Sequence, residues 1–268
     1  MILVTGANGF IGKNVVKELQ NRSLSYITLN RNSQASDNIH FIQDISQPLH
    51  VENLQAIKNC DTLIHLAWNG LPHYKELYHI EENLMAQYNF IKACIQAGVK
   101  NITITGTCLE YGLQEGELST DTATKPFTSY AIAKDCLHKM VHNLQEHFDF
   151  NLKWVRLFYV YGEGQAKHTL YGQLIDAVHQ GLKVFNMSTG DQQRDYLHIS
   201  KVAKYIVDVS QSQQPYKVYN CSSGNPLRVL DFVNTIIKEN KFNIELNTGY
   251  YSYPDYEPKS FWGKPTII

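Results

Sequence analysis

The residues of this chain that could do chemistry begin with a tyrosine and a lysine four positions apart, Tyr130 and Lys134. Residues at this spacing lie on one face of a helix, so an ammonium group would sit beside a phenol. A neighbouring positive charge favours the phenolate, and we therefore expect the pKa of Tyr130 to lie below its reference value of about 10. Such a phenol exchanges a proton near neutral pH. The pair taken alone also fits an ordinary, partly solvated helix face.

A glycine-rich turn near the amino end supplies a second functional pattern. It follows the apolar run 2–5 and leads directly into helical spacing of apolar residues over 10–21. Glycines in a strand–turn–helix context let the backbone approach a pyrophosphate closely, while the first amides of the helix hold the phosphates. The sequence therefore predicts a dinucleotide site. The residues expected to line it are Gly6, Asn8, Gly9, Phe10, Ile11 and Gly12.

Together with Thr107, these two motifs resemble the extended short-chain dehydrogenase/reductase family, and within it the nucleotide-sugar epimerases, dehydratases and 4-ketoreductases. Segments 61–67, 103–112, 155–162 and 194–199 resemble later motifs of that family, so the likeness covers nearly the whole chain. The resemblance implies an NAD(P)-dependent oxidoreductase. Tyr130 would donate a proton and Thr107 would assist it. Lys134 would lower the pKa of Tyr130 and bind the nicotinamide ribose.

The resemblance also implies further contacts with cofactor and substrate. Arg194 would hold the substrate diphosphate, although a surface ion pair is the alternative. Tyr159 stands where many relatives carry an asparagine, which weakens any transfer of sugar specificity. Trp68, Tyr74 and Tyr78 either border the pocket or simply pack. The additional cofactor contacts expected are Asp44, Ile45, Leu66, Ala67 and Lys134, and the substrate contacts are Thr107, Cys108, Tyr130, Tyr159 and Arg194.

The form of the cofactor is indicated at the end of the second predicted strand. An acidic residue there would bind the adenosine ribose of NAD, but this chain has Asn30 followed by Arg31. A guanidinium matches the geometry of a 2′-phosphate. We therefore expect NADPH, with NADH or NAD as the alternative. An exposed loop arginine without a cofactor contact is the other interpretation of Arg31.

The residues after Thr107 bear on the reaction. Related 4,6-dehydratases carry an Asp-Glu pair there, whereas this chain has Cys108 and Leu109. Glu110 is shifted by one place, which in an extended segment would point it to the other face, so dehydration is not expected. Cys108 is either a base beside the ketone, with His168 as a candidate partner, or a small packing residue.

The expected activity is reduction of a nucleotide-linked 4-keto-6-deoxy sugar by NADPH, with Tyr130 as proton donor. Three alternatives stay open. They are a C4 epimerase with bound NAD, an epimerase-reductase that uses Cys108, and a non-catalytic dinucleotide-binding module.

The elements that position these residues alternate between strand and helix patterns, which predicts an α/β fold, a Rossmann-type doubly wound parallel sheet. By resemblance, residues 1–160 with about 198–220 form the dinucleotide-binding domain. A smaller carboxy-terminal substrate lobe would comprise about 161–197 and 221–268. Strands are predicted near 1–5, 25–30, 39–42, 61–66, 101–106, 153–158 and 217–220, and helices near 10–21, 50–58, 79–97, 129–147, 169–180, 199–211 and 228–240.

Composition excludes several classes of partner. A net charge of −1 over 268 residues gives no basic surface for nucleic acid or an anionic membrane, so a small-molecule substrate is expected. Five cysteines without close pairs, and histidines without ligand spacing, predict neither a disulfide framework nor a metal site. We expect no signal peptide, no membrane span and a cytoplasmic location. The resemblance implies a homodimer and a role in polysaccharide or O-antigen biosynthesis, while segment 250–258 either wraps the lobe or forms a surface tail.

Overall fold

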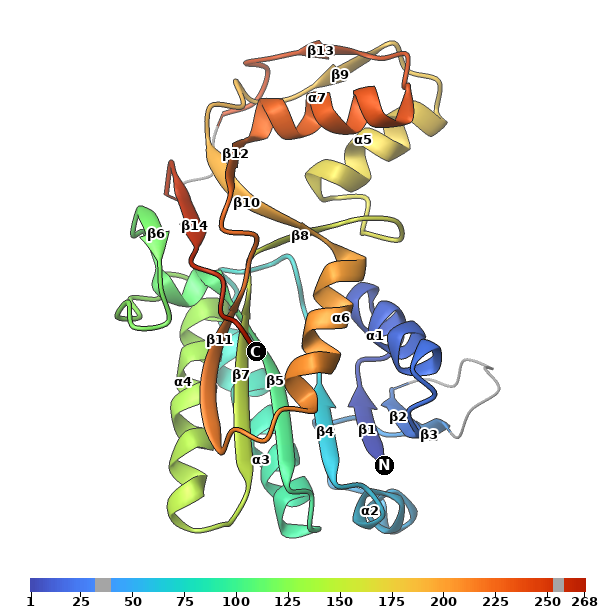
Figure 1. The fold of residues 1–268 in the computed structure, drawn as a ribbon, viewed down its shortest axis with the longest axis vertical. Helices are drawn as coiled ribbons and strands as arrows, with labels where there is room; N and C mark the ends of the chain where they lie inside the picture. Colours follow the sequence, from blue (N-terminus) through green and yellow to red (C-terminus); the bar gives the residue numbers. More distant parts are fainter. Residues whose placement is uncertain (32–39, 253–257) are drawn as a thin grey trace.

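A seven-stranded parallel sheet forms the centre of the protein in a computed structural model, which describes residues 1–31, 40–252 and 258–268 (Figure 1). The strand order is β3-β2-β1-β4-β5-β7-β11, so the chain winds outward in both directions from β1. The predicted doubly wound Rossmann-type sheet is confirmed. Its strands are β1 (Ile2–Thr5), β2 (Tyr26–Asn30), β3 (His40–Ile42), β4 (Thr62–His65), β5 (Asn101–Thr107), β7 (Asn151–Leu157) and β11 (Tyr216–Cys221).

Helices cover both faces of this sheet. Apolar side chains of α1 (Phe10–Asn21) and α6 (Ile199–Ser210) pack on one face. Those of α3 (Leu84–Gln96) and α4 (Ser129–Asn143) pack on the other, while α2 (Val51–Lys58) lies toward the β3 edge (Figure 1). Parallel strands covered on both sides must be apolar on both sides, and β1 and β4 are buried at every residue.

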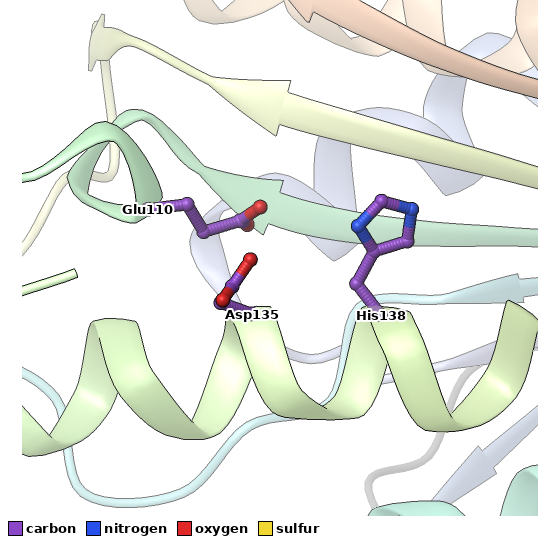
Figure 2. A group of neighbouring side chains, drawn as sticks. All are labelled: Glu110, Asp135 and His138. Carbon is purple, nitrogen blue, oxygen red and sulfur yellow. The ribbon is translucent and has the colours of Figure 1, made fainter. Parts of the chain in front are cut away.

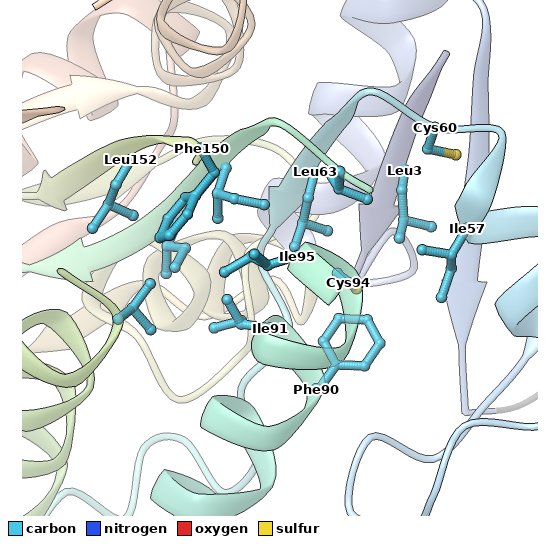
Figure 3. Close-up of a cluster of buried hydrophobic side chains, with 14 of the residues drawn as sticks. Leu3, Ile57, Cys60, Leu63, Phe90, Ile91, Cys94, Ile95, Phe150 and Leu152 are labelled. Carbon is cyan, nitrogen blue, oxygen red and sulfur yellow. The ribbon is translucent and has the colours of Figure 1, made fainter. Parts of the chain in front are cut away.

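The larger core lies between the sheet and helices α3 and α4 (Figure 3). Leu3 and Leu63 project into it, whereas Val4 and Ile64 project into the core under α1 and α6. Successive residues of a strand alternate between faces, so each strand contributes to both cores. The sheet is therefore held rigidly, and the loops at the carboxyl ends of its strands have a fixed base.

The predicted element boundaries agree with the structure within two residues for most elements, although residue 39 lies outside the described residues. Two helices differ. The helix predicted over 79–97 begins with a π-helical turn, η1 (His79–Asn83), before α3 starts. The helix predicted over 129–147 ends at Asn143 and continues as a short 3₁₀ turn, η3 (Leu144–Glu146).

A smaller layer lies beyond the carboxyl ends of the central strands (Figure 1). It contains the sheet β12-β10-β8, the pair β13-β9 and two helices around a separate apolar cluster that includes Leu174, Phe185 and Val233. Its strands were not predicted, and all of them except the six-residue β10 have only three residues, which are too few for an alternating pattern. Its elements are β8 (Tyr159–Tyr161), α5 (Leu170–His179), β9 (Val184–Asn186), β10 (Gln193–His198), β12 (Pro226–Arg228), α7 (Val229–Asn240) and β13 (Glu245–Asn247).

The end of the chain returns from this layer to the central sheet. Strand β14 (Phe261–Gly263) pairs with β6 (Gly116–Leu118), and the carbonyl of Thr266 then accepts a hydrogen bond of 2.6 Å from the Tyr205 hydroxyl on α6. The last residues of the chain therefore pack against the central sheet, whereas Tyr250 and Tyr251 are exposed beside the smaller layer, where the Tyr250 amide donates to the Met187 carbonyl over 2.9 Å. Residues 253–257 lie outside the described residues. Within the described ranges, no helix has both the length and the apolar composition needed to cross a bilayer.

Candidate active site

The glycine turn between β1 and α1 is packed so closely that a side chain fits at neither Gly6 nor Gly12. Gly6 has φ of +71°, and a Cβ there would lie 2.8 Å from the backbone nitrogen of Ala67. At Gly12 a Cβ would lie 2.1 Å from the carbonyl oxygen of Gly6. Glycine is therefore required at both positions. This packing also brings Leu66 and Ala67, which follow β4, against the turn. Their contact with the cofactor stays a prediction.

The amino end of α1 fits a pyrophosphate. Gly9 begins the helix without a side-chain cap, and the first turn carries no acidic residue. Its amides and the positive end of the helix dipole are thus available to an anion. Asn8 is exposed beside them, and Phe10 and Ile11 are half-buried in the first turn. The residues present fit the diphosphate of a dinucleotide.

The residues predicted near the adenosine end lie at the end of β2 and just after β2 and β3. Asn30 donates to the Thr28 hydroxyl over 3.0 Å, and Arg31 is exposed next to it. Asp44 accepts two hydrogen bonds from Ser46, which lower its pKa, and the charge of Arg31 lowers it further. Ile45 packs on the core. Arg31 and Asp44 are therefore near one another, while the segment 32–39 lies outside the described residues.

The predicted proton-transfer residues come together from β5 and α4. β5 ends at Thr107, and Thr128 caps α4 by accepting a hydrogen bond from the Ala131 amide over 3.3 Å. That cap fixes the first turns of α4, so Tyr130 and Lys134 point from the helix toward the end of β5. Both side chains are buried, at 7% and 2% exposure.

The expected lowering of the Tyr130 pKa was wrong. Burial raises the pKa of this phenol above its ordinary value, and a hydrogen bond with the Thr107 side chain only partly opposes the shift. The ammonium of Lys134 is directed elsewhere. It donates to the Thr105 carbonyl over 2.9 Å and lies 4.1 Å from the centre of the Trp68 ring, compared with 6.0 Å from the centre of the Tyr130 ring.

Lys134 is itself strongly perturbed. Burial lowers its pKa to about 7, and the charge of Glu110 opposes this shift. Two neighbouring histidines add no positive charge near it, because burial lowers the pKa of His65 to about 3 and lowers that of His79 as well. The lysine therefore titrates near neutral pH.

Aromatic rings surround Tyr130. The ring centres of Trp68, Tyr74 and His79 lie 5.7, 5.5 and 5.4 Å from its own. Trp68 donates to Nδ1 of His79 over 3.1 Å, so the other nitrogen of His79 carries the proton that it donates to the His73 carbonyl. The sequence indicated Trp68 and Tyr74 but not His79, because the contact of His79 with Tyr130 joins separate segments of the chain and leaves no spacing signal.

The residues after Thr107 form a 3₁₀ turn, η2 (Cys108–Tyr111), and not the extended segment that was expected. Glu110 is fully buried and turns back to accept the Thr107 amide over 2.8 Å. Cys108 is buried close enough to Tyr130 to contribute to raising its pKa. His168, its candidate partner, is exposed on the segment before α5.

Arg194 and Tyr159, two of the predicted substrate contacts, lie against one another. The Arg194 guanidinium is buried, with 1% exposure, and its Nε donates to the Tyr159 hydroxyl over 3.0 Å. Its Nη1 donates to the carbonyls of Gln193 and Lys259 over 2.8 and 3.1 Å. These carbonyls fix the orientation of the guanidinium. Arg228, by contrast, is exposed and paired with Asp231 at the start of α7.

A buried polar cluster beneath Thr107 was not predicted. Ligand-type atoms of Glu110, Asp135 and His138 lie within 4.8 Å of one another (Figure 2). The two oxygens of Glu110 already receive donors from Arg156 and Trp154, so the cationic position beside this carboxylate is taken by a guanidinium. The Glu110 carboxylate is therefore held by Arg156 and Trp154, while His138 contacts the Tyr216 hydroxyl over 3.0 Å and Asp135 pairs with Lys139.

Comparison with known proteins agrees with this geometry. Residues 2–222 match the model of the NAD dependent epimerase/dehydratase family. The chain is 28% identical to a dTDP-6-deoxy-L-talose 4-dehydrogenase (NAD(+)) of Aggregatibacter actinomycetemcomitans, over 98% of both chains. It is 24% identical to the dTDP-4-dehydro-6-deoxyglucose reductase of Escherichia coli, over 93% of this chain and 84% of that one.

Solved structures share the fold. One is MoeE5 in complex with UDP-glucose and NAD, with a TM-score of 0.85 and 24% identity over 98% of this chain and 89% of that one. A UDP-glucose 4-epimerase from Stenotrophomonas maltophila with bound NAD has a TM-score of 0.85 and 18% identity, over 98% and 89% of the two chains. With a family match over most of its length, this chain belongs to the NAD dependent epimerase/dehydratase family.

Proposed function

We propose that the protein is an NADPH-dependent reductase that delivers hydride to the C4 ketone of a nucleotide-linked 4-keto-6-deoxy sugar. The observation that carries this proposal is the convergence of Thr107, Tyr130 and Lys134 at the carboxyl end of β5. The chain that brings them together belongs to the NAD dependent epimerase/dehydratase family. A buried phenol that stays protonated, with a threonine hydroxyl beside it, suits donation of a proton to an alkoxide.

Similarity to two relatives supports C4 as the reacting carbon. One is named as a 4-dehydrogenase of a dTDP-6-deoxy sugar and the other as a reductase of a dTDP-4-dehydro-6-deoxy sugar. Removal of hydride from a C4 carbinol and its delivery to a C4 ketone are the two directions of one reaction. Both names therefore fit a site with one proton-transfer tyrosine.

Residues of this chain would supply the proton and hold the cofactor and the substrate. When bound, the dihydronicotinamide supplies the hydride. Tyr130 would donate its proton to the oxygen that develops charge at C4, and Thr107 would hydrogen-bond the same oxygen. Lys134 would bind the nicotinamide ribose. Arg194, buried and oriented by two carbonyls, would pair with the substrate diphosphate.

NADPH is the proposed reductant because β2 ends at Asn30, where an acidic residue would bind the ribose of NAD, and the exposed Arg31 follows it. A guanidinium at this point suits a 2′-phosphate. The name of one relative specifies NAD(+), so NADH is the competing cofactor. Comparable kcat/KM values for the two cofactors, or a preference for NADH, would refute this part of the proposal.

We further propose that the region of about 161–197 and 221–268 holds the sugar nucleotide, and that the protein is a cytoplasmic homodimer in bacterial polysaccharide or O-antigen biosynthesis. Similarity to the CDP-abequose synthase of Salmonella typhimurium, 24% over 87% of this chain, supports a role in making nucleotide-linked deoxy sugars. Sedimentation equilibrium of the purified protein tests the dimer.

The activity is tested by incubating the protein with NADPH and with dTDP-, GDP-, CDP- and UDP-linked 4-keto-6-deoxy sugars while following the absorbance of the reduced cofactor. We expect oxidation of NADPH with one nucleotide class. Tightly bound NAD in the purified protein, with epimerisation of the sugar and no consumption of cofactor, would instead identify a C4 epimerase.

A further inference from the structure

The buried carboxylate of Glu110 holds the backbone at the end of β5. Glu110 has no solvent exposure, and its Oε1 accepts the amide of Thr107 over 2.8 Å. The Thr107 hydroxyl in turn accepts the amide of Leu109 over 3.2 Å. The two bonds together form a capping box, in which the first and last residues of a Thr-x-x-Glu segment hold one another.

The capping box has a consequence for the Thr107 hydroxyl. A hydroxyl has one proton to donate, and the amide of Leu109 occupies one of its acceptor positions. The hydroxyl proton is therefore left for a group in the site, where Tyr130 lies within hydrogen-bonding reach of Thr107. A threonine held in this way donates to an oxygen in the site.

Glu110 is fixed from its other side by two donors on β7. Arg156 Nε lies 2.8 Å from Oε2, and Trp154 Nε1 lies 3.1 and 3.0 Å from the two oxygens. Arg156 is anchored to the Tyr111 hydroxyl over 3.0 Å, and that hydroxyl donates to Asn220 over 2.7 Å. Burial raises the pKa of Glu110, and these partners oppose that shift because they donate hydrogen bonds to the carboxylate and accept none from it.

We propose that Glu110 is a positioning residue of this active site, holding the Thr107 hydroxyl in the orientation in which it donates to the oxygen at the reacting carbon. The proposal deepens the function proposed above and rests on it, because Thr107 matters only where an alkoxide forms. The mechanism given so far does not use Glu110, Arg156 or Trp154. They lie behind the turn, away from any substrate, and act through Thr107.

Two double variants separate the loss of the oxygen that accepts the Thr107 amide from the loss of the Glu110 charge. Glu110→Leu/Arg156→Met removes both charges and the acceptor for the Thr107 amide. Glu110→Gln/Arg156→Met removes both charges but keeps a carbonyl oxygen at that place. Replacing both members of a buried ion pair avoids leaving one charge unpaired. Glu110→Asp, which keeps the charge but shortens the side chain, serves if the leucine variant does not fold.

The first readout is kinetic. The leucine variant should lose about 100-fold in kcat, the scale of a misplaced catalytic group, without a change in the Kd of the cofactor. The glutamine variant should recover most of that loss, and Glu117→Gln, an exposed carboxylate on β6, should change neither quantity. Wild-type kcat in the leucine variant, or equal losses in both double variants, would overturn the proposal.

The second readout needs no substrate. Amide hydrogen exchange at Thr107, followed by nuclear magnetic resonance, should be at least about 10-fold faster in the leucine variant than in the glutamine variant, because only the latter offers an acceptor. Unchanged exchange would overturn the role of Glu110. If the wild-type protein reduces no nucleotide sugar, the proposed function fails, and this exchange measurement still decides whether Glu110 holds the turn.

Discussion

The ammonium nitrogen of Lys134 lies 4.1 Å from the centre of the Trp68 ring, over its face. A cation in this position is stabilised by the ring quadrupole, which offsets part of the loss of water on burial. Trp68 is itself held by its hydrogen bond to His79. The Lys134 ammonium therefore lies near the Tyr130 phenol but is directed toward the Trp68 ring. The aromatic residues around Lys134 help to determine whether it carries a charge.

The first prediction concerns pH. The pKa of Lys134 is lowered to about 7, whereas that of Tyr130 is raised, so only the lysine changes its charge as the pH rises through neutrality. Because kcat/KM reports the free protein, it should fall above about pH 7 as the ammonium loses its proton. In Lys134→Arg the residual activity should persist to higher pH. The same alkaline fall in both proteins would contradict the assignment of this limb to Lys134.

The second prediction concerns the phenol. Tyr130→Phe should lower kcat by about 10²- to 10⁴-fold, the usual contribution of positioned proton transfer. The Kd of NADPH, measured by fluorescence, should stay unchanged, because the ring and its packing remain. Tyr250→Phe removes a hydroxyl from an exposed tyrosine and should alter neither value. Full turnover in Tyr130→Phe would remove this residue from the mechanism.

The third prediction concerns the glycine turn. A methyl group at Gly12 would lie 2.1 Å from the Gly6 carbonyl oxygen, whereas one at Gly9 would lie 3.3 Å from the same atom. Gly12→Ala must therefore displace the backbone that approaches the pyrophosphate, and binding of NADPH should be lost. Gly9→Ala should weaken it less. Thermal melting of both variants separates loss of binding from loss of fold, and equal affinities for the two would contradict the close packing.

The fourth prediction concerns the choice of cofactor. A hydrogen bond to a charged group contributes about 1.5–3 kcal/mol, so Arg31→Ala should raise the KM for NADPH by about 10- to 100-fold. The KM for NADH should hardly change, since it lacks the 2′-phosphate. Arg228→Ala removes another exposed guanidinium and serves as the control. Equal effects of Arg31→Ala on both cofactors would mean that Arg31 does not contact the phosphate.

Much of the fold could be predicted because its signals are local. The apolar run before Gly6 and the helical spacing after Gly12 each lie within a few residues, and the structure forms β1 and α1 there. The Tyr130 and Lys134 pair was equally readable from its spacing on α4. The pKa of Tyr130 could not be predicted from that spacing, because it depends on burial and on the direction of the Lys134 ammonium.

The parts of the site that were missed depend on contacts between distant segments. His79 contacts Tyr130, and Arg156 contacts Glu110 across 46 positions of the chain, so neither pairing leaves a periodic signal. The capping box is different, because Thr107 and Glu110 form a Thr-x-x-Glu pattern that predicts a turn at the end of β5. That pattern argues against the extended segment that was expected.

The central claim is most directly tested by following the hydride. The protein is mixed with a nucleotide-linked 4-keto-6-deoxy sugar and NADPH deuterated at the transferring position, and the product is analysed by mass spectrometry and nuclear magnetic resonance. The account predicts one deuterium at C4 of the sugar for each NADPH oxidised, and about 10²- to 10⁴-fold slower incorporation in Tyr130→Phe. Conversion of the sugar without deuterium at C4 and without oxidation of NADPH would contradict it.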